Sequence, residues 1–285
     1  MRLFVFGFGY TGAALARRLL PEGWRVAGTS RDEAGRAALA AQGVEPVDPA
    51  EPAELAQALA NTDALLISAP PTVEGCPGFV ALAPFMGGRR PAWIGYLSTT
   101  GVYGDREGRW VFEDSLLLAH SVEGARRAAA ERDWMRLGAS VFRLPGIYGP
   151  GRSAFDRLRD GTAKRLVKPG QVFSRIHVDD LAGGLAASMA RPDRAHVYNL
   201  CDDEPAPADV VTAYAADLLG IARPPEEPFD PAALSPAARR FWSENKRVSN
   251  ARAKAALGWR PAYPTYREGL AAVLAFESGA RASNP

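Results

Sequence analysis

Three glycines near the N-terminus follow the pattern G-x-G-x-x-G, between an apolar run at residues 2–6 and a segment with helical periodicity at residues 11–20. In a strand–turn–helix unit the first glycine permits a tight turn, the second lets the backbone approach a pyrophosphate, and the third allows the helix to pack closely on the strand. The helix N-terminus then faces the phosphate charge. This context favours a dinucleotide-binding loop over a purely structural turn. The loop residues expected to bind the cofactor are Gly7, Gly9, Tyr10, Thr11 and Gly12.

The residues after the second apolar run, 25–29, indicate which dinucleotide would bind. NAD sites usually carry Asp or Glu about 20 residues after the glycine loop, for the ribose 2′-hydroxyl, whereas an arginine accommodates the 2′-phosphate of NADP. Ser30 stands at that position, Arg31 follows it, and Asp32 lies two positions beyond. We therefore predict NADP as the preferred cofactor and NAD as the second choice. The alternative is that Arg31 is a solvated surface residue.

The histidines and cysteines give no sign of a metal site. His120, His177 and His196 are scattered without ligand spacing, and His177 is expected to cap the helix that follows it. Cys76 and Cys201 are far apart and form neither a metal pair nor a disulfide framework, which fits a reducing compartment.

The elements that would position these residues alternate between strand and helix. The expected strands are residues 2–6, 25–29, 64–68, 93–98 and 140–144. The expected helices are residues 11–20, 33–41, 52–60 and 123–137. This alternation predicts an α/β fold: a Rossmann-type doubly wound parallel sheet.

After residue 150 the pattern loosens, which predicts a smaller C-terminal lobe of mixed α/β structure. The expected extended pieces are residues 165–168, 172–176 and 197–200, and the expected helices are 179–189 and 208–219. We divide the chain into an NAD(P)-binding domain, residues 1–150, and a substrate-binding lobe, residues 151–285, with elements free to cross between them. The proline-rich stretch 223–236 is either a surface connector or a lid over a cleft.

Composition narrows the classes of function. The 285 residues are 47% hydrophobic and 23% charged, with a net charge of +2, so no strong field favours nucleic acid or an anionic membrane as a partner. No apolar run approaches the roughly 18 residues that a membrane helix needs. We expect a cytoplasmic protein with a small-molecule substrate, either a monomer or a homodimer.

Four motifs recur in an order that resembles a known family. They are the glycine loop, residues 97–104 (LSTTGVYG), residues 143–150 (RLPGIYGP) and residues 176–180 (IHVDD). Together they resemble the extended short-chain dehydrogenases/reductases, the NAD-dependent epimerase/dehydratase superfamily. The resemblance continues to about residue 270 through segments such as residues 246–250 (KRVSN). It implies a nicotinamide over Thr99. The remaining cofactor contacts expected outside the loop are Ser30, Arg31, Ser68, Ala69, Pro70, Thr99, Pro145 and Gly146.

The resemblance also implies a catalytic Ser or Thr, a Tyr and a Lys. Thr99 matches the hydroxyl position that hydrogen-bonds the substrate's reacting oxygen, although a turn or cap role is its alternative. In the family the Tyr transfers a proton and the Lys lowers the pKa of that Tyr and holds the nicotinamide ribose. This chain has neither a Tyr nor a Lys between Tyr103 and Tyr148.

Glu123 and Arg127 stand where the family has its Tyr and Lys, if Glu131 is aligned with the Glu that often follows the motif. Glu123 would serve as an acid or base if burial raised its pKa. Arg127 would hold a ribose or phosphate but cannot transfer a proton. Loss of acid–base assistance typically removes about 10²–10⁴-fold in rate. The alternative is that both are solvated residues spaced for an i,i+4 ion pair.

Two functions remain open at this stage. The first is an atypical NADP-dependent short-chain reductase, dehydrogenase or epimerase acting on a small polar carbonyl or alcohol, or on a nucleotide-sugar, with Thr99, Glu123 and Arg127 as candidate catalytic residues. The second is a catalytically degenerate protein that senses a dinucleotide and regulates a partner.

Overall fold

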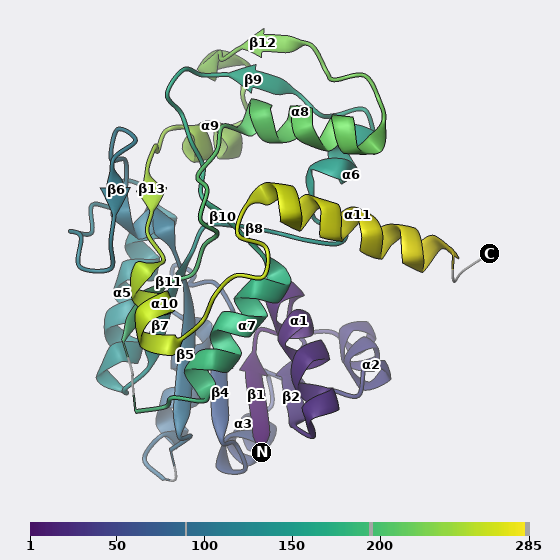
Figure 1. The fold of residues 1–285 in the computed structure, drawn as a ribbon. Coiled ribbons are helices and arrows are strands. Elements are labelled where there is room, and N and C mark those ends of the chain that lie inside the picture. The colour runs from purple at the N-terminus through teal and green to yellow at the C-terminus, as the bar shows by residue number, and fades with distance from the viewer. Residues whose placement is uncertain (89, 194–195, 283–285) are drawn as a thin grey trace.

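The computed structural model describes residues 1–88, 90–193 and 196–282, and its centre is a parallel sheet (Figure 1). The strands are β1 (Arg2–Phe6), β2 (Arg25–Thr29), β3 (Glu45–Val47), β4 (Ala64–Ile67), β5 (Trp93–Thr99), β6 (Trp110–Val111), β7 (Ser140–Leu144), β8 (Gly146–Tyr148), β9 (Arg165–Val167), β10 (Arg175–His177), β11 (Val197–Asn199), β12 (Glu226–Pro228) and β13 (Arg247–Val248). The helices are α1 (Tyr10–Leu19), α2 (Glu33–Ala41), α3 (Pro52–Ala60), α4 (Pro77–Leu82), α5 (Val122–Arg136), α6 (Ala154–Arg159), α7 (Val178–Met189), α8 (Ala208–Leu219), α9 (Pro236–Trp242), α10 (Ala251–Leu257) and α11 (Tyr266–Ala282).

The order of the strands confirms the predicted doubly wound fold. Among the described residues seven strands join in the order β11-β7-β5-β4-β1-β2-β3, and every neighbouring pair is parallel. The order reverses between β1 and β4, which is the switch point where such sheets bind ligands beyond the carboxyl ends of the strands. β11 belongs to this sheet although it comes after residue 150, and α7 packs on α1.

Burial on both faces of the sheet explains the near-continuous apolar runs of its strands. In β1, Leu3 and Val5 join a core with α1, α7 and α10, whereas Phe4 and Phe6 join a second core with α3, α4 and α5. This alternation follows the two-residue period of side chains along a strand. The sheet is therefore a rigid middle layer between two layers of helices.

The second lobe lies beyond the carboxyl ends of the sheet strands, at the top of Figure 1. It contains the parallel pairs β8 with β10 and β9 with β12, and a third pair, β6 with β13, lies beside it. A third core joins α6, α8 and α11.

Two sequence expectations differ from this structure. The strand expected at 172–176 lies further along as β10, because Phe173 instead bridges Ala206 outside the strand. The proline-rich stretch 223–236 is also more than a connector, since β12 pairs with β9 and α9 begins at Pro236.

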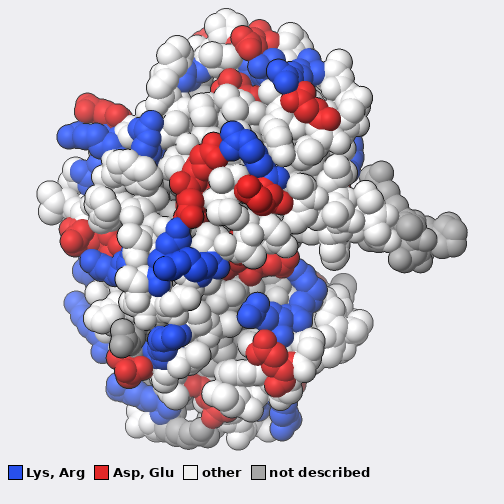
Figure 2. All heavy atoms as spheres, in the orientation of Figure 1, with Lys and Arg blue, Asp and Glu red and all other residues white. Residues whose placement is uncertain are grey.

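Basic and acidic side chains are interspersed on the face shown in Figure 2 and do not gather into a patch of one sign. None of the helices in the described residues combines the length and apolar character needed to cross a membrane.

Candidate functional site

Gly7 occupies a position that only glycine fits. Its φ is +87°, and a Cβ there would lie 2.5 Å from the backbone nitrogen of Ala69. The Gly7 amide donates a hydrogen bond to Oγ1 of Thr29 at 2.8 Å. The turn after β1 is thereby held against the ends of both neighbouring strands, β2 and β4.

The other two glycines of the loop leave room for a ligand and for helix packing. A Cβ at Gly9 would have no described atom within 4 Å, so this backbone is open to approach. A Cβ at Gly12 would lie 3.2 Å from the Phe8 ring and 3.3 Å from Val5. No described side chain caps α1, which leaves its N-terminal amides for an anion. These three environments suit a pyrophosphate cradle.

A cavity of about 820 Å³ opens beside this loop, and we call it the glycine-loop cavity. It brings together most of the cofactor contacts expected from the sequence. The expected residues that line it are Gly7, Gly9, Ser30, Arg31, Ser68, Ala69 and Pro70.

Tyr10, Thr11 and Gly12 are not among the described residues that line the glycine-loop cavity. Thr11 and Gly12 are buried in α1. The Tyr10 hydroxyl donates to the carbonyl of Pro150 at 3.1 Å, and the Arg152 guanidinium lies 5.7 Å from its ring centre. Tyr10 therefore joins the sheet to the second lobe.

The acidic residues around the glycine-loop cavity bind other groups and do not pair with Arg31. Oδ1 of Asp32 accepts the Gly35 amide at 2.7 Å and caps α2. Glu74 accepts the Thr72 hydroxyl at 2.5 Å, which lowers the pKa of this exposed carboxyl. Arg31 makes no ion pair with any described residue, so its guanidinium is free to meet a phosphate.

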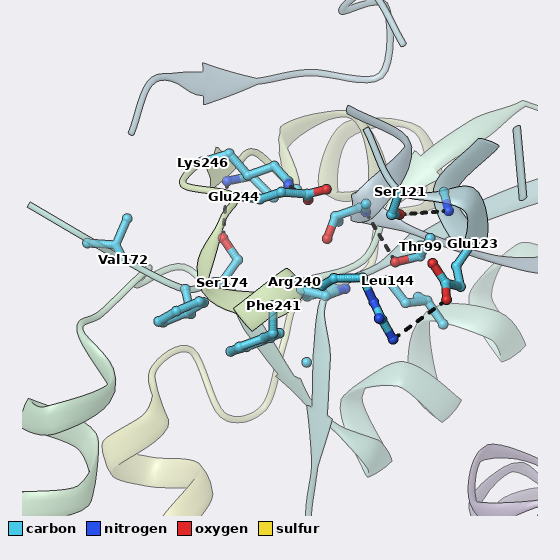
Figure 3. A pocket seen from close by; sticks show the side chains of 17 residues that line it. Thr99, Ser121, Glu123, Leu144, Val172, Ser174, Arg240, Phe241, Glu244 and Lys246 are labelled. Atoms are coloured by element: carbon cyan, nitrogen blue, oxygen red, sulfur yellow. Dashed lines mark hydrogen bonds and ion pairs between the residues drawn. The ribbon is translucent and has the colours of Figure 1, made fainter. Parts of the chain in front are cut away.

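A second cavity, of about 420 Å³, lies at the carboxyl ends of β5 and β7 and reaches the second lobe; we call it the Thr99 cavity (Figure 3). It contains four of the residues expected from the sequence, and Arg127 is absent from its described lining. The lining residues are Thr99, Thr100, Gly101, Ser121, Glu123, Gly124, Leu144, Pro145, Gly146, Val172, Phe173, Ser174, Arg240, Phe241, Glu244, Lys246 and Val248.

Thr99 caps a turn, as the alternative for it expected, and it also lines the Thr99 cavity. Its Oγ1 accepts the Gly101 amide at 3.1 Å and caps the short helical turn Thr100–Tyr103, and its side chain also faces the cavity. Because the amide occupies only an acceptor site, the Thr99 hydroxyl proton remains available for donation to a ligand.

Glu123 and Arg127 do not pair with each other in the described structure. The Glu123 side chain is 64% exposed, and its nearest cation is Nη2 of Arg240 at 3.8 Å, across the cavity mouth. Arg127 is half-buried and donates instead to the carbonyl of Leu97 in β5. The expected i,i+4 ion pair does not form between the described side chains, although the exposure of Glu123 agrees with a solvated residue.

Lys246 is one of three charged residues of the cavity lining, with Arg240 and Glu244, that were not expected from the sequence. The residue is 8% exposed, and its Nζ contacts Oε2 of Glu244. Burial lowers the pKa of Lys246, while the Glu244 carboxylate acts in the opposite direction. The sequence feature that singles out Lys246 is the rarity of lysine in this chain, since only four of the 34 basic residues are lysines.

Comparisons with known proteins agree with the motifs. No family model matches the chain. It is 50% identical to a functionally unknown conserved protein from Silicibacter pomeroyi DSS, with a TM-score of 0.90 over 96% of this chain and 98% of that chain. It is 26% identical to a Methylobacillus flagellatus protein solved as a candidate NAD-dependent epimerase/dehydratase, with a TM-score of 0.73 over 97% of this chain and 98% of that chain. In its motifs, sequence and fold the chain is similar to the NAD-dependent epimerase/dehydratase superfamily.

Three further proteins are similar to this chain in sequence or in fold. Protein YeeZ of Escherichia coli K12 is 27% identical over 241 residues, which are 78% of this chain and 85% of that protein. The 3-diazoavenalumate denitrifying reductase of a Streptomyces species is 35% identical over 164 residues, and the match spans 50% of this chain and 51% of that enzyme. The human epimerase family protein SDR39U1, solved with NADPH, shares the fold at 20% identity and a TM-score of 0.77, over 96% of this chain and 99% of that chain.

A buried polar network fixes the superfamily's long helix, α5, against the sheet. Glu131 accepts from Arg143 at 2.8 Å and from the Ser98 hydroxyl at 2.5 Å. Arg143 also donates to the Tyr103 hydroxyl at 3.0 Å, which in turn donates to Asn199 at 2.7 Å. The network holds α5 at the distance from β5 and β7 that the Thr99 cavity requires.

A third cavity, of about 460 Å³, adjoins the Thr99 cavity, and we call it the Arg175 cavity. The two cavities share Gly146, Phe173, Ser174 and Phe241. The rings of Phe173 and Phe241 lie parallel, 4.6 Å apart. A ligand longer than the Thr99 cavity would extend along this aromatic pair.

His177 and the two cysteines are not among the described residues that line the three cavities. His177 caps α7 as predicted, because its Nδ1 accepts the Asp179 amide at 3.2 Å. Cys76 and Cys201 are both buried and free. In the part of the chain that the structure describes, no group of three or more His, Cys, Asp or Glu side chains is arranged to hold a metal.

Proposed function

We propose that this protein is an NADP-dependent oxidoreductase or epimerase whose dinucleotide lies along the carboxyl edge of the sheet, from the glycine-loop cavity to the Thr99 cavity. The observation that carries the proposal is that the glycine-loop cavity spans the switch point between β1 and β4, while the Thr99 cavity lies at the ends of β5 and β7 on the same edge of the sheet. The relative named as a reductase and the fold neighbour solved with NADPH support the same chemistry.

The residues present fit such a dinucleotide. The backbone at Gly9 would face the pyrophosphate, since no described atom lies within 4 Å of a Cβ there, and Gly7 permits the tight turn against Ala69 that presents it. Ser30 and Arg31 would hold the 2′-phosphate, which gives the preference for NADP. Residues 68–70 would line the adenosine, and residues 145–146 the nicotinamide. A bound nicotinamide supplies hydride-transfer chemistry at the substrate carbon.

The substrate would bind in the Thr99 cavity, between residues of both lobes. Thr99 would donate its hydroxyl proton to the reacting oxygen, and Glu123 lies at the cavity mouth. Arg127 would act indirectly. Its guanidinium donates to the Leu97 carbonyl in β5, and the same strand ends at Thr99. We propose a small polar carbonyl or alcohol as substrate; a nucleotide-linked sugar would also occupy the Arg175 cavity. On this proposal residues 1–150 bind the dinucleotide and residues 151–285 mainly bind substrate.

Titration with NADPH and NADH, followed by tryptophan fluorescence, tests the cofactor site. Gly9→Val puts a side chain into open space, so the fold is retained while the space for the pyrophosphate is filled. We expect at least about tenfold weaker NADPH binding, a loss of roughly 1.4 kcal/mol. Gly87→Val is the matched control, since its Cβ also meets no described atom within 4 Å and Gly87 does not line the glycine-loop cavity. Equal affinity in wild type and Gly9→Val would refute the site.

A dinucleotide sensor without catalysis is the second candidate. The lack of a Tyr or Lys in α5 favours it, and Arg127, which stands at the position of the Lys, donates to the β5 backbone and does not line the Thr99 cavity. An NADPH-oxidation screen over small ketones and UDP-sugars distinguishes the two. Turnover that falls in Thr99→Val establishes the enzyme, whereas silence across the screen with NADPH bound favours the sensor.

A further inference from the structure

The Thr99 cavity needs a proton-transferring group if it is an active site, and α5 does not supply the superfamily's Tyr and Lys. Lys246 is the sole lysine among the described residues that line this cavity. The chain uses arginine at 30 of its 34 basic positions, so lysine is an uncommon choice here. An arginine would be a permanent cation, whereas a lysine can release and regain a proton.

The backbone on both sides of Lys246 is held in place. The Asn245 amide donates to Oδ1 of Asp105 at 2.7 Å, and the Val248 amide donates to Oγ of Ser174 at 3.1 Å. β13 begins directly after Lys246 and pairs with β6. The lysine is therefore fixed in the wall that faces Thr99 and Glu123 (Figure 3).

The charges around Lys246 suit a group that exchanges protons. Its side chain is 9% exposed and that of Glu244 is 16% exposed, and the two are in direct contact. Burial lowers the pKa of the Lys246 ammonium; the carboxylates of Glu244 and Asp105 oppose this shift, and the Arg106 guanidinium adds to it. The resulting decrease moves the amine toward the range in which lysines act as acids and bases.

We propose that Lys246 is the proton-transferring residue of the Thr99 cavity and that the Glu244 carboxylate, in contact with its Nζ, holds it in place. The inference rests on the proposed function. In the reducing direction the carbonyl carbon gains a hydrogen with its electron pair from NADPH, which becomes NADP⁺. The C=O π pair moves to oxygen, one Nζ–H bond of Lys246 breaks and an O–H bond forms. The neutral amine then regains a proton from water, and the oxidising direction reverses each step.

Competitive labelling with acetic anhydride tests the lysine without any substrate. Arginines separate the four lysines along the sequence, so cleavage after arginine gives each lysine its own peptide for mass spectrometry after labelling between pH 6 and 11. Lys164, whose side chain is 63% exposed, is the internal reference. We expect Lys246 to reach half-reactivity at a lower pH than the exposed reference lysine, because burial lowers the pKa of Lys246. Co-titration with Lys164, or no labelling at any pH, would overturn the proposal.

Turnover of the carbonyl compound found in the ketone and UDP-sugar screen tests the role. We expect Lys246→Met to lose about 10²–10⁴-fold in kcat while its NADPH affinity is unchanged. Lys246→Arg keeps the charge but cannot transfer a proton, so we expect no rescue and the loss of one ionisation from the pH profile. Lys164→Met is the control for loss of a lysine elsewhere.

The two proposals fail in different ways. If NADPH does not bind, or if no compound in the screen is reduced, the proposed function fails, and labelling still reports whether Lys246 titrates early. If Lys246→Met binds NADPH and reduces the compound at the wild-type rate with an unchanged pH profile, the role of Lys246 is refuted and the oxidoreductase stands.

Discussion

Arg31 is the residue whose charge would separate the two nicotinamide dinucleotides. It lines the glycine-loop cavity without an ion-pair partner among the described residues, and Asp32 is occupied as the cap of α2. A charge-assisted hydrogen bond is worth about 1.5–3 kcal/mol, so Arg31→Ala should weaken NADPH binding roughly 10–100-fold. NADH affinity should change less than about twofold, because it has no 2′-phosphate to lose a contact. Calorimetric titration of both cofactors measures this, and an equal loss for NADH would contradict it.

Asp202 is a buried carboxyl whose oxygens have no hydrogen-bond partner among the described residues. Burial raises its pKa to about 8, although the Arg175 guanidinium acts in the opposite direction. The folded state therefore holds this proton over a pH range in which the unfolded chain, with a pKa of about 3.9, has lost it. Its contribution to stability is complete below about pH 4 and is lost as the pH rises through about 8.

Removing the Asp202 carboxyl should remove this pH dependence. Between about pH 4 and 8 the wild-type free energy of unfolding should carry a contribution of about −1.4 kcal/mol per pH unit from this one group. Asp202→Asn cannot ionise, so its stability relative to wild type should rise across this window. Urea denaturation at several pH values measures the difference, and parallel curves for the two proteins would show that the carboxyl is ionised when folded.

At the scale of elements, α5 depends on a buried ion pair for its position. Its buried face carries mostly small residues, and the Glu131–Arg143 pair, with side chains 2% and 5% exposed, joins it to β7. Arg143→Met would leave the Glu131 charge buried without its partner, which typically costs about 3–5 kcal/mol. Arg143→Met combined with Glu131→Gln should recover part of this loss. Urea midpoints measure both variants, and a loss below about 1 kcal/mol in the single variant would argue against the coupling.

At the scale of the whole molecule, the proposed ligand would join elements that are distant in the sequence. The glycine-loop cavity belongs to the first half of the chain, whereas the Thr99 cavity also has walls from β13 and α9. NADPH at 100 times its Kd should stabilise the folded state by about 2.7 kcal/mol. We expect an increase in Tm of several degrees for wild type and a much smaller one for Gly9→Val, measured by calorimetry. The same shift in both proteins would mean that NADPH binds elsewhere.

The sequence alone determined the parallel sheet and the glycine loop. Continuous apolar runs separated by helical segments require burial on both faces, and this requirement is local enough to place β1, β2, β4, β5 and β7 from the pattern. Gly7 likewise indicates a turn in the sequence, and the structure gives it the positive φ that favours glycine. These features follow from neighbours along the chain, so no knowledge of the distant chain was needed to predict them.

The tertiary structure decided which side chains share the Thr99 cavity. Lys246 reaches it because β13 pairs with β6, and Arg127 is absent from it because its guanidinium binds the Leu97 carbonyl. Neither outcome is encoded in spacing: a helical period gives the face of a residue, but the partner of a long side chain depends on which backbone groups and charges the folded chain brings within reach. The fold class was therefore predictable from local pattern, whereas the charged groups of the cavity emerge only from long-range packing.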